Sequence, residues 1–306
     1  MILGEPIILG GGNGIPVEII VETKPGASVL CIKGATVLEK TANADGKAVF
    51  EVKKEGLWTI QASLDGETVE TTIFIEHKIS EEFPFIDPVL ANNSWEKISE
   101  VARAGKASQY WNVGDTKPFV CNGTTYEAQI IGFDHDDVTD SASYGRSKAG
   151  ITFQFKGVTS DSTVWDTSIT GKVWSQSSLR NTTMSSLLNG MGELQNYIVG
   201  VNKECQSKAG AFSMLETIED KLFCLSEYEI KGTKINSYTE EGRQYEFYKA
   251  GNSTQKYFGS TQKNWWTRSL YGSSSLPNYR VCITGNGSIE YRQFSESYCS
   301  APAFCL

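Results

Sequence analysis

Short runs of alternating apolar and polar residues dominate the first quarter of the chain. They are rich in Val, Ile and Thr and predict strands at Pro16–Glu22, Ser28–Lys33, Lys47–Val52, Leu57–Leu64 and Thr68–Ile75. Turn signals such as Asp45-Gly46 and Asp65-Gly66 separate them. Several short strands at this spacing predict an all-β sandwich over residues 15–76.

From residue 93 onward, helical and strand patterns are mixed. Asn93 as N-cap and Glu96 three residues later predict a helix that carries Trp95, Ile98 and Val101 on one face. Strands are expected at Lys117–Cys121, Thr125–Phe133, Ile151–Phe155 and Lys221–Ser226, with an Asn122-Gly123 turn between the first two. Helices are expected at Leu179–Leu188 and Glu193–Lys203, and a β-rich run ends the chain.

These patterns divide the chain into four parts. Residues 1–14 are apolar and then glycine-rich, so they are expected to anchor the protein against a neighbouring subunit or docking protein. The β-sandwich at 15–76 is followed by a linker at 77–92 with two prolines. Residues 93–306 form an α+β domain, which makes the fold class multidomain: an all-β sandwich followed by an α+β domain.

The first strands resemble a known type of module. The segments KPGASVLCIKG and TANADGKAVFEVKKEGLWTIQAS carry this similarity, and they resemble transthyretin-like or immunoglobulin-like modules of multidomain surface proteins. Such modules act as spacers or anchors, so the resemblance implies a structural role for this part of the chain.

The larger domain contains a series of distinctive motifs over residues 92–306, which include AGITFQF, DKLFCLSEYEI, EGRQYEFY, WWTRS and APAFCL, in this order. Through them it resembles a family of unknown function that recurs in tail-associated and structural proteins of Firmicutes phages and prophages. The ending WWTRS…APAFCL is also similar to the C-type-lectin-like fold of formylglycine-generating enzymes and phage receptor-binding proteins. In that fold, loops between the closing strands present the ligand surface.

Charge and cysteine content narrow the classes of function. The formal net charge is −8, which argues against nucleic acid as the main partner. No apolar run approaches the roughly 20 residues that span a bilayer, and the N-terminus is a poor secretory signal because Glu5 interrupts it. Seven cysteines without a C-x-x-C pair indicate buried thiols made in a bacterial cytoplasm.

An acidic loop offers the best candidate for a metal site. Asp134, Asp136 and Asp137 could converge on Ca²⁺, which prefers oxygen ligands. The loop lacks the glycine and the distal glutamate of an EF-hand, and a polar turn explains it better. No cofactor is therefore expected.

Catalytic patterns are poorly developed. The chain has two histidines and no nucleophile elbow, so neither a triad nor an enzyme of another kind is expected. An enzyme of the formylglycine-generating type, using Cys282 and Cys299, remains a third alternative.

The aromatic and polar residues of the C-terminal run are the preferred binding candidates. Tyrosine and arginine recur at binding interfaces, and sugars also stack on aromatic rings. The ligand-binding set is expected to face outward and comprises Tyr271, Asn278, Tyr279, Arg280, Tyr291, Arg292 and Tyr298. The segments 270–279 and 291–298 are expected to lie side by side.

Together with the phage resemblance, this surface predicts a virion component of the tail, baseplate, collar or fibre. Its expected role is adhesion to a glycan or protein of the host surface, with other virion proteins as partners and a homo-oligomeric state. No contact with nucleic acid and no membrane insertion are expected. The alternative is a purely structural or head-decoration protein without a host ligand.

Overall fold

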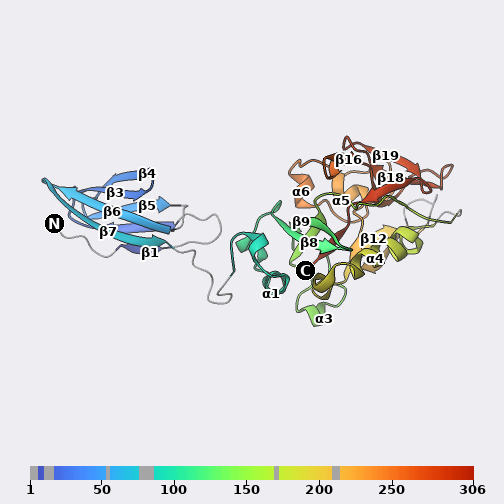
Figure 1. The fold of residues 1–306 in the computed structure, drawn as a ribbon, viewed down its shortest axis with the longest axis horizontal. Helices are drawn as coiled ribbons and strands as arrows, with labels where there is room; N and C mark the ends of the chain where they lie inside the picture. Colours follow the sequence, from blue (N-terminus) through green and yellow to red (C-terminus); the bar gives the residue numbers. More distant parts are fainter. Residues whose placement is uncertain (1–5, 10–16, 53–55, 76–85, 169–171, 209–213) are drawn as a thin grey trace. The chain divides into compact units, whose positions relative to one another are not determined.

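A computed structural model describes residues 6–9, 17–52, 56–75, 86–168, 172–208 and 214–306 (Figure 1). The chain forms two compact units, Met1–Pro88 and Val89–Leu306. It is mostly β-sheet, with 41% of residues in strands and 18% in helices, and its described part contains several sheets and no barrel. No described helix is long and apolar enough to span a membrane.

The first unit consists of two antiparallel sheets. One sheet has the order β1 (Ile7–Leu9), β2 (Val17–Glu22), β5 (Lys47–Val52). The other has the order β4 (Thr36–Thr41), β3 (Ser28–Lys33), β6 (Gly56–Leu64), β7 (Glu67–Ile75). Strand β4 was not predicted from the sequence.

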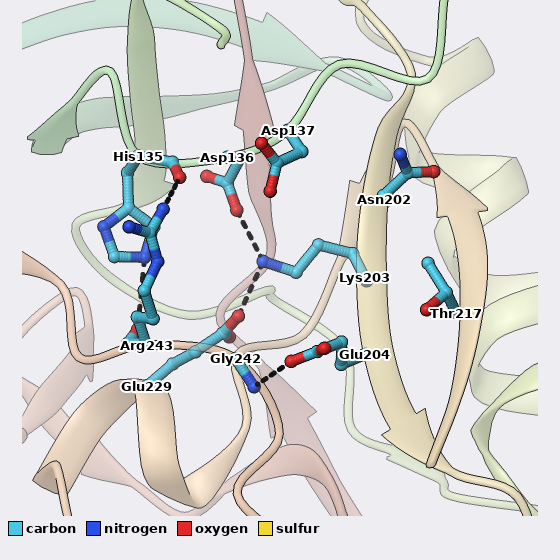
Figure 2. A pocket seen from close by; sticks show the side chains of 10 residues that line it. All are labelled: His135, Asp136, Asp137, Asn202, Lys203, Glu204, Thr217, Glu229, Gly242 and Arg243. Atoms are coloured by element: carbon cyan, nitrogen blue, oxygen red, sulfur yellow. Dashed lines mark hydrogen bonds and ion pairs between the residues drawn. The ribbon is translucent and has the colours of Figure 1, made fainter. Parts of the chain in front are cut away.

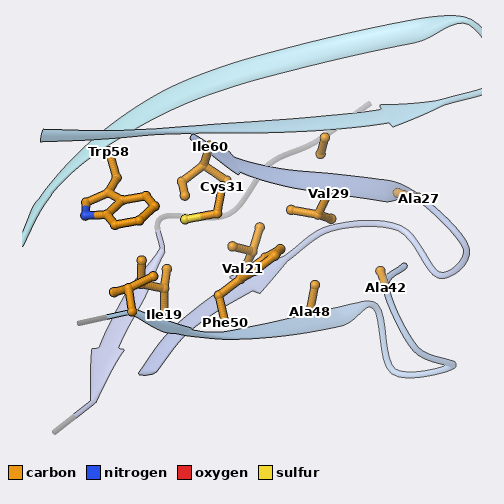
Figure 3. Packing of buried hydrophobic residues seen from close by; sticks show 12 residues of the cluster. Ile19, Val21, Ala27, Val29, Cys31, Ala42, Ala48, Phe50, Trp58 and Ile60 are labelled. Carbon is orange, nitrogen blue, oxygen red and sulfur yellow. The ribbon is translucent and has the colours of Figure 1, made fainter. Parts of the chain in front are cut away.

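A single apolar core fills the space between these sheets. Phe50 and Ile19 of one sheet face Trp58 and Ile60 of the other, and all four are buried (Figure 3). Strand β5 alternates as expected, with Ala48, Phe50 and Val52 turned inward. The period-2 pattern of the sequence therefore describes the buried face of this unit correctly.

Two expected parts fall partly on residues outside the description. Of the anchor at 1–14 the structure describes residues 6–9, and β1 pairs there with β2 of the same unit. Of the linker at 77–92 it describes residues 86–92, where Ile86 and Leu90 are buried.

The second unit contains two five-stranded sheets. The first has the order β14 (Leu222–Phe223), β21 (Ala303–Cys305), β10 (Ile151–Phe155), β9 (Thr124–Phe133), β8 (Thr116–Cys121). The second has the order β11 (Thr163–Val164), β20 (Ser297–Ser300), β17 (Trp265–Leu270), β18 (Tyr279–Ile283), β19 (Ile289–Gln293). Two hairpins complete it: β12 (Val201–Gln206) with β13 (Leu215–Asp220), and β15 (Lys256–Phe258) with β16 (Thr261–Lys263).

Central strands of both sheets are buried along their whole length. Every residue of β10, β17 and β21 is buried, and β21 lies between β14 and β10. Trp265 and Trp266 are both core residues, and their indole N–H groups donate to the carbonyl oxygens of Thr254 and Thr163. Strand β17 is unusual among these buried strands because one of its buried residues is the charged Arg268.

The Asn122-Gly123 turn connects β8 and β9 as predicted. Cys121 pairs with Thr124, and both turn residues have positive φ, 48° and 77°. This backbone suits the twist of a two-residue hairpin, and Asn and Gly tolerate it best.

Helices of the second unit are short. The described helices are α1 (Trp95–Arg103), α2 (Ala107–Tyr110), α3 (Ser141–Tyr144), α4 (Ser185–Asn189), α5 (Glu227–Lys231), α6 (Glu246–Lys249), the 3-10 turns η1 (Leu90–Asn92), η2 (Trp174–Gln176) and η4 (Gly192–Asn196), and the π-helical η3 (Leu179–Met184). The helical prediction for Leu179–Leu188 corresponds to η3 and α4.

Two helical predictions need correction. Ser94, not Asn93, caps α1, because the Asn93 side chain instead donates to the carbonyls of Val89 and Leu90. The predicted helix Glu193–Lys203 is wrong: η4 ends at Asn196, and β12 begins at Val201. In β12, Val201, Lys203 and Cys205 are buried alternately, which is a strand period that a helical pattern does not predict.

Candidate functional site

Arg268 lies at the centre of a buried ionic network. Its Nη1 is 2.5 Å from Glu229 Oε2 and its Nη2 is 2.9 Å from Glu229 Oε1, which is a bidentate pair. The guanidinium also donates to the backbone carbonyls of Glu204, Cys224 and Glu241. This buried arginine therefore ties β17 to β12, α5 and the segment that precedes α6.

Glu229 has a local reason to occupy this position. Ser226 and Glu229 form a capping box at the start of α5, in which each side chain accepts from the other residue's backbone N–H. Burial by itself raises the pKa of Glu229, but the charges of Arg268 and Lys203 outweigh it and lower the pKa. The carboxylate is thus held ionised inside the protein.

Lys203 connects Glu229 to a second carboxylate. Its Nζ lies 2.6 Å from Glu229 Oε1 and 2.7 Å from Asp136 Oδ1 (Figure 2). It also lies 3.1 Å from the hydroxyl oxygen of Tyr245. These contacts occupy all three ammonium hydrogens. Burial lowers the pKa of Lys203, but Asp136 and Glu229 outweigh this effect, so that the net shift is upward.

Asp136 accepts from three side chains of the network. Besides Lys203, it accepts hydrogen bonds from the hydroxyls of Thr152 at 2.6 Å and Tyr245 at 3.0 Å. Burial opposes its ionisation, yet Lys203 lowers its pKa well below the usual value. A buried ion of this kind is tolerated because it has a cationic partner and a hydrogen-bond donor at each oxygen.

Glu241 extends the network at the other side. It accepts from the backbone N–H of Gln206 at 2.9 Å and from the hydroxyl of Ser269. Burial raises its pKa above the usual value although Arg268 is nearby. Asp136 and Glu229 differ from Glu241, because the charges of Lys203 and Arg268 lower the pKa of Asp136 and Glu229 in spite of burial.

A polar pocket of about 380 Å³ opens above this network (Figure 2). Its floor is formed by Asp136, Lys203 and Glu229, which are buried. Its more exposed wall is formed by His135, Asp137, Asn202, Glu204, Thr217, Gly242 and Arg243. The volume suits a small molecule, and the lining suits a hydrophilic one.

His135 is engaged in contacts that hold the pocket wall. Its ring stacks on Tyr245 with centroids 4.0 Å apart, and its Nε2 lies 3.1 Å from the carbonyl oxygen of Arg243. Burial lowers the pKa of His135, which keeps the ring neutral near pH 7.

The acidic loop does not converge on a common point. Asp134 pairs with Arg146 at 2.8 Å, Asp137 pairs with Lys148 at 2.6 Å, and Asp136 points inward to Lys203. Within the described residues no group of three or more His, Cys, Asp or Glu side chains could hold a metal ion. The loop places each carboxylate beside a different cation, so Ca²⁺ ligation by Asp134, Asp136 and Asp137 has no geometric basis.

Three of the expected binding tyrosines lie together. Tyr271 and Tyr291 stack with ring centroids 3.8 Å apart, and Tyr279 meets Tyr291 edge-on at 5.8 Å. Asn278 accepts from the backbone N–H of Phe294, which joins the two segments. The prediction that segments 270–279 and 291–298 are neighbours is therefore confirmed. We call Tyr271, Tyr279 and Tyr291 the tyrosine cluster.

Two further candidates do not belong to the tyrosine cluster. Arg292 is half-buried and forms an ion pair with Glu290. Tyr298 packs on Trp266 with centroids 4.7 Å apart and donates to Glu296 at 2.7 Å.

Arg280 is not an outward-facing residue, and this expectation is wrong. Its side chain is fully buried, with the guanidinium carbon 4.5 Å from the Trp165 ring. It donates to the carbonyls of Pro277, Tyr279 and Lys172, and burial lowers its pKa to about 10. In β18, Tyr279 and Arg280 point to opposite faces, so the two neighbours cannot share one surface.

The ionic network was not predicted from the sequence, although two signals were present. Arg268 interrupts an otherwise uncharged strand, and Ser226 with Glu229 fits the spacing of a capping box. Neither signal shows that the two elements meet, because 39 residues separate Glu229 from Arg268.

Comparison with known proteins assigns the second unit. Residues 152–306 match a family described as "Domain of unknown function (DUF6273)". The chain belongs to this family. The matched region contains the Arg268–Glu229 pair and the tyrosine cluster, whereas Asp136 lies before it. No curated protein and no solved structure matches the chain.

Proposed function

We propose that this protein is a phage or prophage virion component that binds the host surface through the tyrosine cluster. One observation carries the binding role: Tyr271 and Tyr291, twenty positions apart in the chain, are stacked at 3.8 Å, and Tyr291 is 36% exposed. Preorganised aromatic rings bury a large area upon binding and lose little side-chain entropy, which is why tyrosine is frequent at binding surfaces.

The two units suit different roles in this proposal, anchoring for the first and binding for the second. The two sheets of the first unit enclose a core of their own, which suits an immunoglobulin-like or transthyretin-like sandwich that serves as an anchor or spacer. In the second unit, the buried strand with Trp265 and Arg268 and the apolar terminal strand suit a C-type-lectin-like fold. In such a fold the tyrosine cluster would lie among the ligand-binding loops. The phage context itself rests on the ordered motifs of the sequence.

Binding to cells tests the role of the cluster. The labelled full chain is incubated with a panel of Firmicutes cells and with a glycan array, and bound protein is quantified. Tyr291→Ala and Tyr271→Ala should reduce binding about tenfold, since truncation of a central aromatic contact costs on the order of 1–2 kcal/mol. Tyr257→Ala is the matched control, because Tyr257 is 41% exposed on the β15–β16 hairpin outside the cluster.

The result distinguishes the alternatives. Loss of binding in the cluster variants alone supports adhesion. Binding that is equal in all variants refutes the role of the cluster and favours a purely structural or head-decoration protein. Electron microscopy of labelled particles would then locate the chain in the virion or show that it is absent.

A thiol enzyme of the formylglycine-generating type receives little support from the cysteines. All seven are free thiols and buried, and burial raises the pKa of Cys282 to about 12. Cys282 and Cys299 pair with opposite sides of β17, since Cys282 is the partner of Trp266 and Cys299 the partner of Trp265. A strand therefore separates the two thiols.

A further inference from the structure

The polar pocket above the ionic network is distinct from the tyrosine cluster and shares no residue with it. The charged groups of its floor are already engaged with one another and with neighbouring side chains. The three donors of Lys203 are taken by Asp136, Glu229 and Tyr245, and the carboxylates of Asp136 and Glu229 are held by Lys203, Thr152 and Arg268. A ligand would therefore be recognised by the wall.

The wall offers one acidic group with unused capacity. Glu204 is exposed, and within the described residues its carboxylate has no ion pair and accepts one hydrogen bond, from the N–H of Gly242 at 3.2 Å. Asp137, the other acid of the wall, is already paired with Lys148 at 2.6 Å. Glu204 is thus the carboxylate that can receive a positive charge from a ligand.

The same wall offers one basic group with unused capacity. Arg243 is exposed and donates through Nη2 to the backbone oxygen of His135, but no carboxylate of the described residues lies within ion-pair distance of it. His135 supplies no second positive charge, because burial lowers its pKa. A guanidinium in this state can still bind a carboxylate through its remaining N–H groups.

Glu204 and Arg243 both line the pocket, and Gly242, which contacts Glu204, is the chain neighbour of Arg243 (Figure 2). Two opposite charges that share a small cavity without pairing with each other are complementary to a molecule that carries both charges. Asn202 and Thr217 add neutral polar groups to the wall. The volume of about 380 Å³ accommodates a molecule of amino-acid size.

We propose that this pocket binds a small zwitterion, a free α-amino acid, with its ammonium group at Glu204 and its carboxylate at Arg243. The site does not depend on the proposed adhesion function. A purely anionic ligand would meet Glu204 and the paired acids of the floor, and a purely cationic one would meet Arg243. The zwitterion satisfies both unpaired groups at once, and each contact is a charge-assisted hydrogen bond.

Calorimetric titration of the full chain with free L-amino acids tests the proposal. The strongest binder is then compared with its N-acetyl derivative, which lacks the ammonium charge, and its amide, which lacks the carboxylate. Each derivative should bind at least tenfold more weakly, since loss of a charge-assisted hydrogen bond has about this effect.

Variants assign each charge to its partner. Glu204→Gln should weaken the free amino acid about tenfold yet leave binding of the N-acetyl derivative unchanged, and Arg243→Gln should do the same for the amide. Glu240→Gln is the matched control, because it removes an exposed carboxylate two residues from Gly242 that does not line the pocket. Circular dichroism confirms that each variant is folded.

Three results would overturn the proposal. The first is that no free amino acid binds at millimolar concentration. The second is that both derivatives bind as well as the parent compound. The third is that Glu240→Gln weakens binding as much as Glu204→Gln, since the effect would then come from overall charge rather than from the pocket.

Discussion

Arg268 and Glu229 form a bidentate ion pair in which neither side chain has any solvent exposure. Their two short contacts, 2.5 and 2.9 Å, connect the central strand β17 with the N-terminal cap of α5. Such a pair is favourable in place because both partners are satisfied, and removing one partner leaves a buried charge without compensation. The geometry makes this pair the first target for mutation.

Arg268→Met should destabilise the second unit strongly. The variant leaves Lys203 as the one cation beside Glu229 and removes a donor from each of three backbone carbonyls, so we expect a loss of about 3–5 kcal/mol in the free energy of unfolding. Chemical denaturation measures it. Arg292→Met removes a half-exposed arginine paired with Glu290 and should cost less than about 1 kcal/mol. Similar losses for both variants would contradict the central role of Arg268.

Asp136 should make stability depend on acid pH. Its folded pKa is lowered, so its contribution is present above the unfolded value of about 4 and is lost as the pH falls toward the folded pKa. Asp136→Asn should reduce stability at pH 7 and flatten the decline between about pH 5 and pH 2. Unfolding curves at several pH values test this. A decline as steep as in the wild-type protein would show that other carboxylates cause it.

Lys256 should make stability depend on pH in the neutral to alkaline range. Its ammonium is buried against the carbonyls of Phe155 and Lys156, and burial lowers its pKa from 10.5 to about 7. Between these values the unfolded state binds more protons, so stability should rise with pH from about 7 to about 10.5. Below pH 7 the buried charge costs most.

Lys256→Met should therefore stabilise the protein most at pH 6, by about 1–2 kcal/mol, and progressively less as the pH rises. The gain is smaller than the full pKa shift implies, since two carbonyls lose a donor. Parallel stability curves for the variant and the wild-type protein between pH 6 and 10 would mean that Lys256 titrates normally.

Substitutions of Arg280 and Tyr291 should differ in their effect on stability, because Arg280 is buried and Tyr291 is exposed. Arg280→Ala empties a buried site against Trp165 and removes a donor from each of three carbonyls, so a loss of at least about 2 kcal/mol is expected. Tyr291→Ala removes an exposed ring and should cost less than about 1 kcal/mol. Thermal or chemical denaturation of both variants provides the measurement. The burial of Arg280 would be refuted if its variant were as stable as the wild-type protein.

Local sequence patterns predicted many of the strands and turns correctly. Alternation in β5 and β6 identified the buried faces of the first unit, and Asn122-Gly123 identified a hairpin, because strand period and turn chemistry depend on residues close together in the chain. The aromatic segments 270–279 and 291–298 were recognised as neighbours for the same reason: the short hairpin β18–β19 joins them.

Long-range contacts decided the rest. The pattern at Leu194, Ile198 and Val201 fits a helix by spacing, but β12 forms because Val201–Gln206 pairs with Leu215–Asp220. The sequence predicted Arg280 to be a surface residue, but in the folded protein its guanidinium packs against the ring of Trp165. The ionic network joins Asp136, Lys203, Glu229 and Arg268 from four separate segments. Sequence alone determined which residues can carry charge and where strands such as β5, β6, β8 and β9 form. Only the tertiary structure decided which charges meet, because a buried ion is stable only where the fold brings its partner.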